Sequence, residues 1–210
     1  MGDDPNRPRR AAAVLLAAGR STRMGGENKL LKEIEPGIPV VRRAVERALA
    51  SGLAPFYVVT GHEAGKVRDA LAGLGCRFVH NPDYAQGLSG SIRTGFRRAV
   101  ADGACGVLVL LGDMPFLPMA SVEAVLAAAA GHPGKVVQAV HAGKPAHPVW
   151  LPAEAGDLLE RLEGDRGVRS LLAQSGGGMI DVEVPDTATV DIDTPADFLA
   201  ARRRAGAFKD

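Results

Sequence analysis

Glycines and cations gather in one short segment near the start of the chain. The stretch from Gly19 to Lys29 contains three glycines, two arginines and one lysine. Glycine lets a backbone turn sharply and approach a ligand closely, and free backbone N–H groups in such a loop form a concavity that binds anions. Arginine adds a planar fork for phosphate oxygens, and lysine adds a mobile point charge. The segment therefore predicts an anion site, with a solvated surface loop as the alternative; it contains neither GxxxxGK[ST] nor GxGxxG.

A carboxylate occurs at a second place that could serve the same ligand. Asp113 follows the apolar run 107–111, which is typical of a central buried strand. A hard oxygen ligand in that position suits Mg²⁺ that bridges nucleotide phosphates. Gly112, Asp113 and Pro115 also form turns readily, so a purely structural turn is the alternative.

Two further polar segments have both a structural and a functional interpretation. Asp191 and Asp193 lie two positions apart in or beside a predicted strand and would point to the same side of it; alternatively, Asp193 or Thr194 caps a helix that begins at Pro195. The segment 80–91 is polar and opens a predicted helix, whose N-terminus can receive an anion. A simple helix cap by Ser89 or Ser91 is the alternative there.

Alternating apolar and amphipathic runs predict the elements that position these residues. Predicted strands, several of them β-branched and flanked by glycine or proline, cover residues 12–16, 56–60, 76–80, 107–111, 136–140, 147–151, 179–184 and 189–192. Predicted helices cover the segment from Val40 to a stop at Gly52, and residues 64–71, 91–101, 121–130, 155–162, 167–174 and 195–204.

This alternation implies a single-domain α/β fold: a mostly parallel, Rossmann-like sheet in a three-layer α/β/α arrangement. Ligands of such sheets bind beyond the carboxyl ends of the strands. The loop 19–29 and Asp113 both follow predicted strands, so we expect them to share that edge. We expect residues 1–10 to form a flexible segment and residues 11–210 to form the domain.

The composition excludes several classes of function. A formal net charge of +1 and an aromatic content of 4% argue against nucleic-acid binding. No stretch is long enough to span a membrane. We do not interpret the basic and alanine-rich start as a signal peptide, because its apolar run is short and leads into the glycine-rich loop. Two cysteines without metal-ligand spacing fit a reducing, cytoplasmic setting.

The segment Leu16 to Lys29 reads LAAGRSTRMGGENK and resembles the signature loop of the MobA-like nucleotidyltransferases. The resemblance extends over nearly the whole chain, from Val14 to Phe198. In that family the loop wraps the triphosphate of an incoming nucleotide, which implies that Arg23 and Lys29 stabilise phosphate charge. The resemblance also implies a fold like that of the nucleotide-diphospho-sugar transferases.

Other segments are similar to motifs of the same family. GDMPF at 112–116 looks like its metal-binding motif, and DIDTPADF at 191–198 resembles its C-terminal motif, in which an aspartate can complete the metal site. NPDYAQGLSGSIRTG at 81–95 resembles the molybdenum cofactor cytidylyltransferase branch, as do GKPAHPVWL at 143–151 and GDRGVRSLL at 164–172.

The resemblance implies several groups of site residues. The catalytic residues would be Arg23, Lys29 and Asp113, and the metal ligands Asp113 and Asp193. The nucleotide would contact Leu16, Ala17, Ala18, Gly19, Arg20, Ser21, Thr22, Arg23, Met24, Gly25, Lys29, Thr60, Gly61, Asn81, Ser89 and Gly112. The acceptor would contact Ser91, His147 and Pro148.

The implied reaction is attack by the phosphate of molybdopterin on the α-phosphorus of CTP, with Mg²⁺ or Mn²⁺ as the metal and pyrophosphate as the leaving group. Ala18 favours CTP, because cytidylyl-type members carry alanine where guanylyl-type members carry glycine. One alternative is a nucleotidyltransferase for another nucleotide or acceptor, such as a sugar phosphate, methylerythritol phosphate or phospholactate. The other is a non-catalytic chaperone that handles the molybdenum cofactor. Docking on a molybdoenzyme is an expected partnership of the cytidylyltransferase and of the chaperone.

Overall fold

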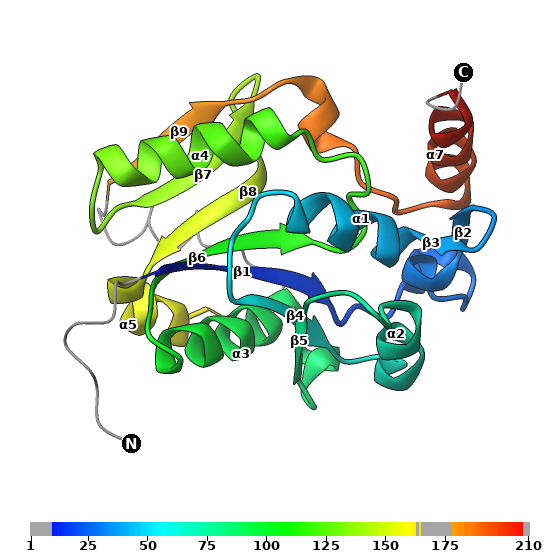
Figure 1. Cartoon of the computed structure of the whole chain (residues 1–210), viewed down its shortest axis with the longest axis horizontal. Helices are drawn as coiled ribbons and strands as arrows, with labels where there is room; N and C mark the ends of the chain where they lie inside the picture. The colour runs from blue at the N-terminus through cyan, green and yellow to red at the C-terminus, as the bar shows by residue number, and fades with distance from the viewer. Residues whose placement is uncertain (1–9, 163, 165–177, 208–210) are drawn as a thin grey trace.

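The computed structural model describes residues 10–162, 164 and 178–207 of the chain. Its centre is a seven-stranded sheet with the strand order β5-β4-β1-β6-β8-β7-β9 (Figure 1). β1 (Arg10–Ala17) lies between β4 (Phe56–Thr60) and β6 (Ala104–Leu111) and is parallel to both. β5 (Arg77–His80) continues the parallel arrangement at the edge beside β4.

The other half of the sheet contains one strand of opposite direction. β8 (Lys144–Pro152) is antiparallel to β6 and to β7 (Val136–His141), whereas β7 is parallel to the edge strand β9 (Met179–Glu183). The prediction of a mostly parallel sheet in a single α/β domain is confirmed.

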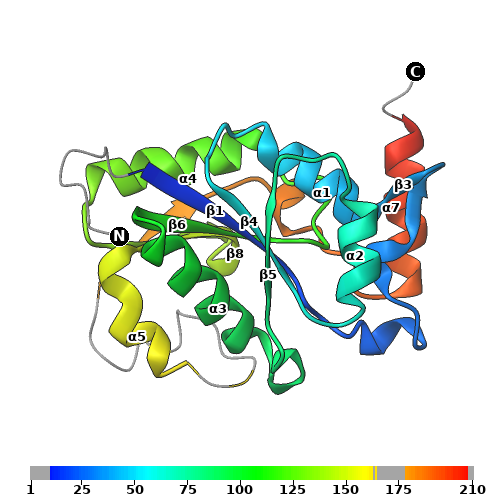
Figure 2. The same cartoon turned by 60° about the horizontal axis from the view of Figure 1, so that its bottom comes forward.

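Helices cover both faces of this sheet. α1 (Val40–Leu49), α2 (Ala64–Ala70) and α4 (Met119–Gly131) pack on one face, and α3 (Leu88–Ala101) and α5 (Gly156–Glu160) pack on the other (Figure 2). Successive side chains of a strand point to opposite faces. Accordingly, Ala13 and Leu15 of β1 belong to the core on the first face, and Val14 and Leu16 to the core on the second.

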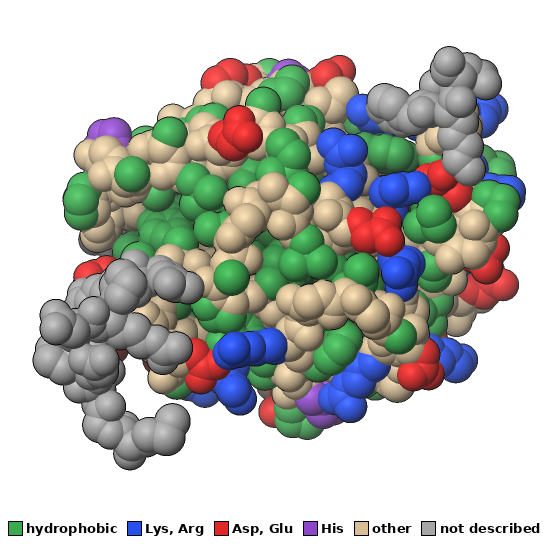
Figure 3. All heavy atoms as spheres, viewed as in Figure 1, with side chains coloured by type: hydrophobic (Ala, Val, Ile, Leu, Met, Phe, Trp, Pro, Cys, Tyr) green, Lys and Arg blue, Asp and Glu red, His purple; other side chains and the backbone are tan. Residues whose placement is uncertain are grey.

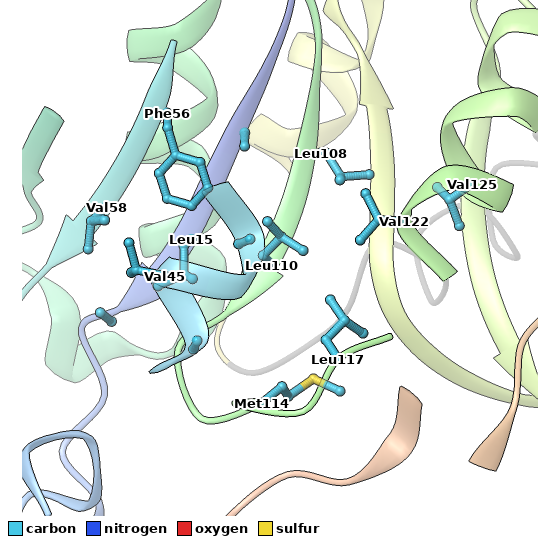
Figure 4. Close-up of a cluster of buried hydrophobic side chains, with 14 of the residues drawn as sticks. Leu15, Val45, Phe56, Val58, Leu108, Leu110, Met114, Leu117, Val122 and Val125 are labelled. Carbon is cyan, nitrogen blue, oxygen red and sulfur yellow. The ribbon is translucent and has the colours of Figure 1, made fainter. Parts of the chain in front are cut away.

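Mostly aliphatic side chains fill the first of these cores (Figure 4). Leu15, Val58 and Leu108 project from the sheet, and Val45 and Val122 meet them from α1 and α4. Removing such apolar surface from water is the main favourable term in folding. This packing therefore fixes the positions of the strands whose carboxyl ends carry the candidate site.

A third, smaller core lies at one end of the molecule (Figure 1). There α7 (Pro195–Ala207) packs on the hairpin formed by β2 (Glu33–Glu35) and β3 (Ile38–Pro39). The buried members of this core are Met24, Ile34, Val40, Phe116, Ile192, Phe198, Ala201 and Ala205. The core thus joins the C-terminal segment to the loop after β1, from which Met24 comes.

Several sequence-based predictions differ from the structure. The strand predicted over residues 189–192 is wrong: Asp186–Thr189 forms the 3₁₀ helix η5, and residues 190–194 belong to no strand. The Ile192 N–H donates to the carbonyl of Asp113 at 3.1 Å instead of joining a ladder. The β2–β3 hairpin was not predicted, and α3 begins three residues before the predicted start at Ser91. The helix predicted over 167–174 lies outside the described residues.

On the face shown in Figure 3, hydrophobic and uncharged groups cover much of the centre, and most charged side chains lie around the rim and toward the right-hand side. Within the part of the chain that the structure describes, no helix combines the length and the apolar character needed to cross a membrane.

Candidate active site

Two polar side chains close the loop that follows β1. Ser21 has φ 52° and ψ 38°, a left-handed conformation, at the start of the 3₁₀ helix η1 (Thr22–Met24). Its Oγ accepts a hydrogen bond from the N–H of Lys29 at 3.1 Å. The Oδ1 of Asn28 accepts from the N–H of Leu30 at 3.1 Å and so caps the next 3₁₀ helix, η2 (Lys29–Leu31). These contacts bring Lys29 back to the beginning of its own loop.

The middle of the loop is fixed from outside. Met24 is 5% exposed and packs in the third core. Gly25 and Gly26 have φ values of 68° and 96°, which an L side chain rarely adopts, so the turn after Met24 depends on glycine. Met24 therefore anchors the loop and does not line the cavity at the end of β1.

Lys29 bridges two carboxylates from distant parts of the chain. Its Nζ lies 2.7 Å from Asp113 Oδ2 and 2.7 Å from Asp193 Oδ1. Asp113 lies just past the carboxyl end of β6, and the hydrogen bond from Ile192 to the Asp113 carbonyl holds the two acidic segments side by side. The structure therefore brings Lys29 and Asp113 together at the same edge of the sheet.

Arg23 extends this charged cluster towards solvent. Its guanidinium lies 2.5 Å from Asp193 Oδ2, and its side chain is 73% exposed, whereas the Lys29 and Asp113 side chains are only 13% and 17% exposed. The cluster thus has a largely buried centre at Lys29 and one exposed cation. An exposed guanidinium can exchange its carboxylate partner for a phosphate at little cost.

The charge state of the cluster is set by these contacts. Burial alone would lower the pKa of Lys29, but the charges and hydrogen bonds of Asp113 and Asp193 outweigh it and raise the pKa. The hydrogen bond from Lys29 lowers the pKa of the Asp193 carboxyl. Lys29 is therefore cationic and Asp193 anionic at neutral pH.

The two aspartates also fit a divalent cation. Asp113 Oδ1 is buried and has no hydrogen-bond partner among the described residues. In that part of the chain, no group of three or more His, Cys, Asp or Glu side chains is arranged to hold a metal ion. Mg²⁺ commonly takes one or two carboxylates and completes its coordination with water and substrate phosphates. Asp113 and Asp193 match that donor set.

A cavity of about 520 Å³ opens over the charged cluster. Eleven of the predicted site residues line it: Leu16, Ala18, Gly19, Arg20, Ser21, Thr22, Arg23, Lys29, Ser91, Asp113 and Asp193. The rest of the lining was not predicted and comprises Leu30, Tyr84, Ala85, Gly87, Leu88 and Leu111. Four of these six fall within the 81–95 motif, where the sequence pattern pointed only to the polar residues.

Tyr84 closes one wall of the cavity because Gly61 has no side chain. A Cβ added to Gly61 would lie 2.5 Å from Tyr84 Cβ and 2.9 Å from Ala18 Cβ, closer than real contacts allow. The Tyr84 ring also lies 6.0 Å from the ring of His62. Gly61 therefore lets the Tyr84 ring approach the end of β1, although Gly61 itself does not line the cavity.

The other predicted site residues lie outside the cavity lining. Asn81 is buried and donates from Nδ2 to Ser91 Oγ at 3.0 Å, so it orients a serine that does face the cavity. The Thr60 hydroxyl donates to the carbonyl of Val79 at 3.5 Å, and the N–H of Gly112 donates to the carbonyl of Leu16 at 2.9 Å. The remaining ones are Ala17, Met24, Gly25, Gly61, Ser89, His147 and Pro148.

His147 and Pro148 lie in β8 and are joined by a cis peptide bond. Burial lowers the pKa of His147, although the charge of Asp113 works in the opposite direction. Its Nδ1 is buried without a hydrogen-bond partner among the described residues. His147 is therefore near enough to Asp113 to feel its charge, but it does not reach the cavity.

The C-terminal motif combines the two roles that the sequence left open. Thr194 is the helix cap, because its Oγ1 accepts from the N–H of Asp197 at 3.2 Å. Asp193 is free to turn its carboxylate to the cations of the cavity. Asp191 does not line the cavity, although partial burial, followed by the charges of Asp113 and Asp193, raises the pKa of its carboxyl.

Solved structures with this architecture identify the class of protein. A nucleotidyl transferase from Methanothermobacter thermautotroptrophicus superposes with a TM-score of 0.82 at 27% identity and covers 95% of this chain and 99% of its own. A Mycobacterium tuberculosis protein solved as a complex with manganese has the same fold, with a TM-score of 0.72 at 24% identity, and covers 93% of this chain and 98% of its own. The fold and the site define a nucleotidyltransferase.

Sequence comparison then gives the family. The family described as the MobA-like NTP transferase domain matches residues 13–179, and the chain belongs to it. Among its relatives are a molybdenum cofactor guanylyltransferase of Mesorhizobium japonicum (29% identity, 91% of this chain and 94% of the relative) and the purine catabolism protein PucB of Bacillus subtilis (30% identity, 90% and 95%). A molybdenum cofactor cytidylyltransferase of Escherichia coli is 28% identical over 91% of this chain and 95% of its own length.

Proposed function

We propose that this protein transfers CMP from CTP to the phosphate of molybdopterin, with release of pyrophosphate. The observation that carries the proposal is the position of Lys29 between Asp113 and Asp193 in a cavity at the carboxyl edge of the sheet. Cations and carboxylates that converge at such a point suit a triphosphate and a metal ion. The choice of CTP is supported by Ala18, which lines this cavity.

The reaction depends on stabilising negative charge more than on proton transfer. An oxygen of the acceptor phosphate forms a bond to the α-phosphorus, the bond from that phosphorus to the bridging oxygen breaks, and pyrophosphate leaves. The attacking oxygen is already anionic, so no general base is required. Two polyanions must nevertheless meet in line, so positioning and electrostatic stabilisation supply most of the rate.

Each charged residue of the cluster has a distinct part in this reaction. Lys29 is held in place and stabilises negative charge as the pyrophosphate departs, and the exposed Arg23 exchanges Asp193 for phosphate oxygens. Asp113 and Asp193 would hold Mg²⁺ or Mn²⁺, which when bound neutralises phosphate oxygens and helps to orient the α-phosphate. The N–H groups of the loop 19–29 add fixed partial positive charge beside them.

The acceptor and the base are tested together in one experiment. Pyrophosphate release is measured with CTP, GTP and ATP, in the presence and absence of molybdopterin, with Mg²⁺ supplied. The proposal expects release with CTP alone and only when molybdopterin is present. Release with GTP instead would favour guanylyl transfer, the activity named for one of the relatives. Nucleotide binding without any release would favour a chaperone, with docking on a molybdoenzyme as its function.

Variants then test the assigned roles. Removing one preorganised electrostatic group commonly lowers a rate by roughly 100- to 1000-fold. We expect losses of that size for Lys29→Ala and Asp113→Ala with the fold retained. Lys66→Ala is the matched control, because Lys66 pairs with Glu63 on the surface and does not line the cavity. Turnover close to that of the control in either site variant would contradict the mechanism.

A further inference from the structure

The position of Asp193 is not set by the sheet. It belongs to the segment 190–194, which is part of no strand or helix. On its N-terminal side, Ile192 is fully buried in the third core and its N–H donates to the carbonyl of Asp113. These contacts fix the backbone before Asp193 but leave its own N–H and the direction of its side chain to be fixed by something else.

Asp197 supplies that second point of attachment. Its Oδ2 accepts hydrogen bonds from the N–H of Asp193 at 3.2 Å, from the N–H of Thr194 at 2.8 Å and from the Thr194 hydroxyl at 2.8 Å. The N–H of Asp197 donates in return to Thr194 Oγ1 at 3.2 Å. This reciprocal pattern is a capping box at the start of α7, and it reaches one residue further back, to Asp193.

Asp197 stands behind the cavity and does not line it. The hydrogen bonds from Thr194 lower the pKa of its carboxyl, so it is ionised at neutral pH and keeps all of its acceptor capacity. The next residue, Phe198, is buried in the third core, which ties the first turn of α7 to Met24 of the loop after β1. Asp197 is thus a rigid anchor for its neighbours and not a mobile surface group.

We propose that Asp197 is a positioning residue that holds the Asp193 carboxylate at the charged end of the cavity. The inference rests on the proposed function, since it concerns a carboxylate assigned there to the metal ion. Without Asp197, the N–H of Asp193 loses its acceptor, and Thr194 loses the acceptor of both its N–H and its hydroxyl. The carboxylate then spends less time against Arg23 and Lys29.

Loss of Asp197 should therefore affect ligand binding differently in the presence and in the absence of a divalent cation. Groups that orient metal ligands typically contribute 10- to 100-fold to metal affinity, so loss of Asp197 should weaken metal binding by about that factor. Without a metal ion, the Asp193 carboxylate competes with phosphates for Arg23 and Lys29. Releasing it therefore should not weaken nucleotide binding in a chelator, whereas general disruption of the site would weaken both.

The test compares Asp197→Ala, Asp197→Glu and Ala200→Gly in the full chain. Glutamate completes the capping box in its commonest form, so Asp197→Glu is the conservative rescue. Ala200→Gly weakens α7 through helix propensity at an exposed position and leaves the cap intact. Mn²⁺ binding in the presence of CTP is followed by the paramagnetic resonance of free Mn²⁺, and CTP binding in EDTA is followed by calorimetry.

We expect Asp197→Ala to weaken Mn²⁺ binding about 10-fold or more, to leave CTP binding in EDTA no weaker, and to be rescued by Asp197→Glu. The inference is overturned if Ala200→Gly weakens Mn²⁺ binding equally, or if Asp197→Ala keeps wild-type Mn²⁺ affinity or loses CTP affinity in EDTA by the same factor. A wild-type chain that binds no CTP overturns the proposed function as well. A wild-type chain that binds CTP and releases pyrophosphate, while Asp197→Ala behaves normally, overturns only the inference.

Discussion

Replacing Lys29 by methionine removes the cation that two carboxylates share and keeps a side chain of similar length. Asp113 and Asp193 then face each other without a partner between them. The structure predicts that this substitution destabilises the folded protein as well as impairing turnover, because the two anions come from segments that the fold brings together.

The geometry sets the magnitude of this effect. Each carboxylate oxygen lies 2.7 Å from Lys29 Nζ, so the two oxygens are at most roughly 5.4 Å apart, where two unit charges repel by about 3 kcal/mol at an effective dielectric constant of about 20. The side chains of Asp113 and Asp193 are 17% and 35% exposed, so water screens part of this repulsion. We therefore expect Lys29→Met to lower the free energy of unfolding by about 1–3 kcal/mol at neutral pH.

Urea unfolding followed by circular dichroism measures this loss, and a second substitution identifies its cause. In Lys29→Met/Asp193→Asn one of the two repelling charges is gone, so the double variant should recover most of the lost stability. Lys66→Met is the control for the lysine-to-methionine change, because the Lys66 side chain is 70% exposed and its ion pair with Glu63 is a surface pair. Such pairs contribute at most about 1 kcal/mol.

Two results would refute the reasoning. One is a Lys29→Met variant as stable as Lys66→Met, which would mean that the carboxylates separate freely and that the fold does not force them together. The other is a double variant less stable than either single variant, which would mean that Asp193 is held by contacts unrelated to charge.

Three other predictions concern packing, pH dependence and the cavity wall. Gly106→Ala should cost about 1–3 kcal/mol of stability in urea unfolding, because the added Cβ would collide with the Trp150 indole ring, whereas Gly131→Ala, which meets open space, should cost little. Hydrogen bonding from Tyr57, followed by that from Arg98, lowers the pKa of the Asp102 carboxyl. The ionised carboxylate therefore stabilises the fold at pH values above the pKa that Asp102 has in the unfolded chain, and this stabilisation is lost as the pH falls through its pKa in the folded protein. Asp102→Asn should accordingly be less stable than wild type at neutral pH in urea unfolding, and a difference that persists at the acid end would contradict this. If the Tyr84 ring stacks on the base, Tyr84→Ala should weaken the binding of CTP, measured by calorimetry, by about 1–3 kcal/mol. Equal weakening of the binding of tripolyphosphate, which has no base, would rule out a contact between the ring and the base.

The edge of the sheet at which the charged residues meet could be predicted from the sequence. An apolar run that ends in Gly112 and Asp113 indicates a buried strand with a carboxylate just past its end, and the glycine-rich loop comes after another such run. Since the carboxyl ends of parallel strands share one edge of a sheet, the proximity of the loop and Asp113 can be predicted without knowing how the side chains pack. The structure places Lys29 and Asp113 in contact at that edge.

The sequence pattern could not show which side chains of the loop face the ligand. Met24 lies inside the motif but points into the third core, and the polar Asn81 lies behind Ser91. Conversely, Tyr84 lines the cavity only because Gly61, distant in sequence, leaves room for it. Which side chains face the cavity depends on contacts between segments that are distant in the sequence, and local periodicity carries no information about those contacts.

The C-terminal acidic motif also adopts a backbone that local sequence preference does not predict, and this backbone determines which aspartate reaches the site. Residues 189–192 are rich in β-branched side chains, which favours a strand locally. Burial of Ile192 in the third core and its hydrogen bond to Asp113 override that preference. The irregular backbone that results lets Asp193 turn towards Lys29 while Thr194 starts α7. A strand would have pointed Asp191 and Asp193 the same way. The irregular backbone instead lets Asp193 join Asp113 in contact with Lys29, while Asp191 does not line the cavity.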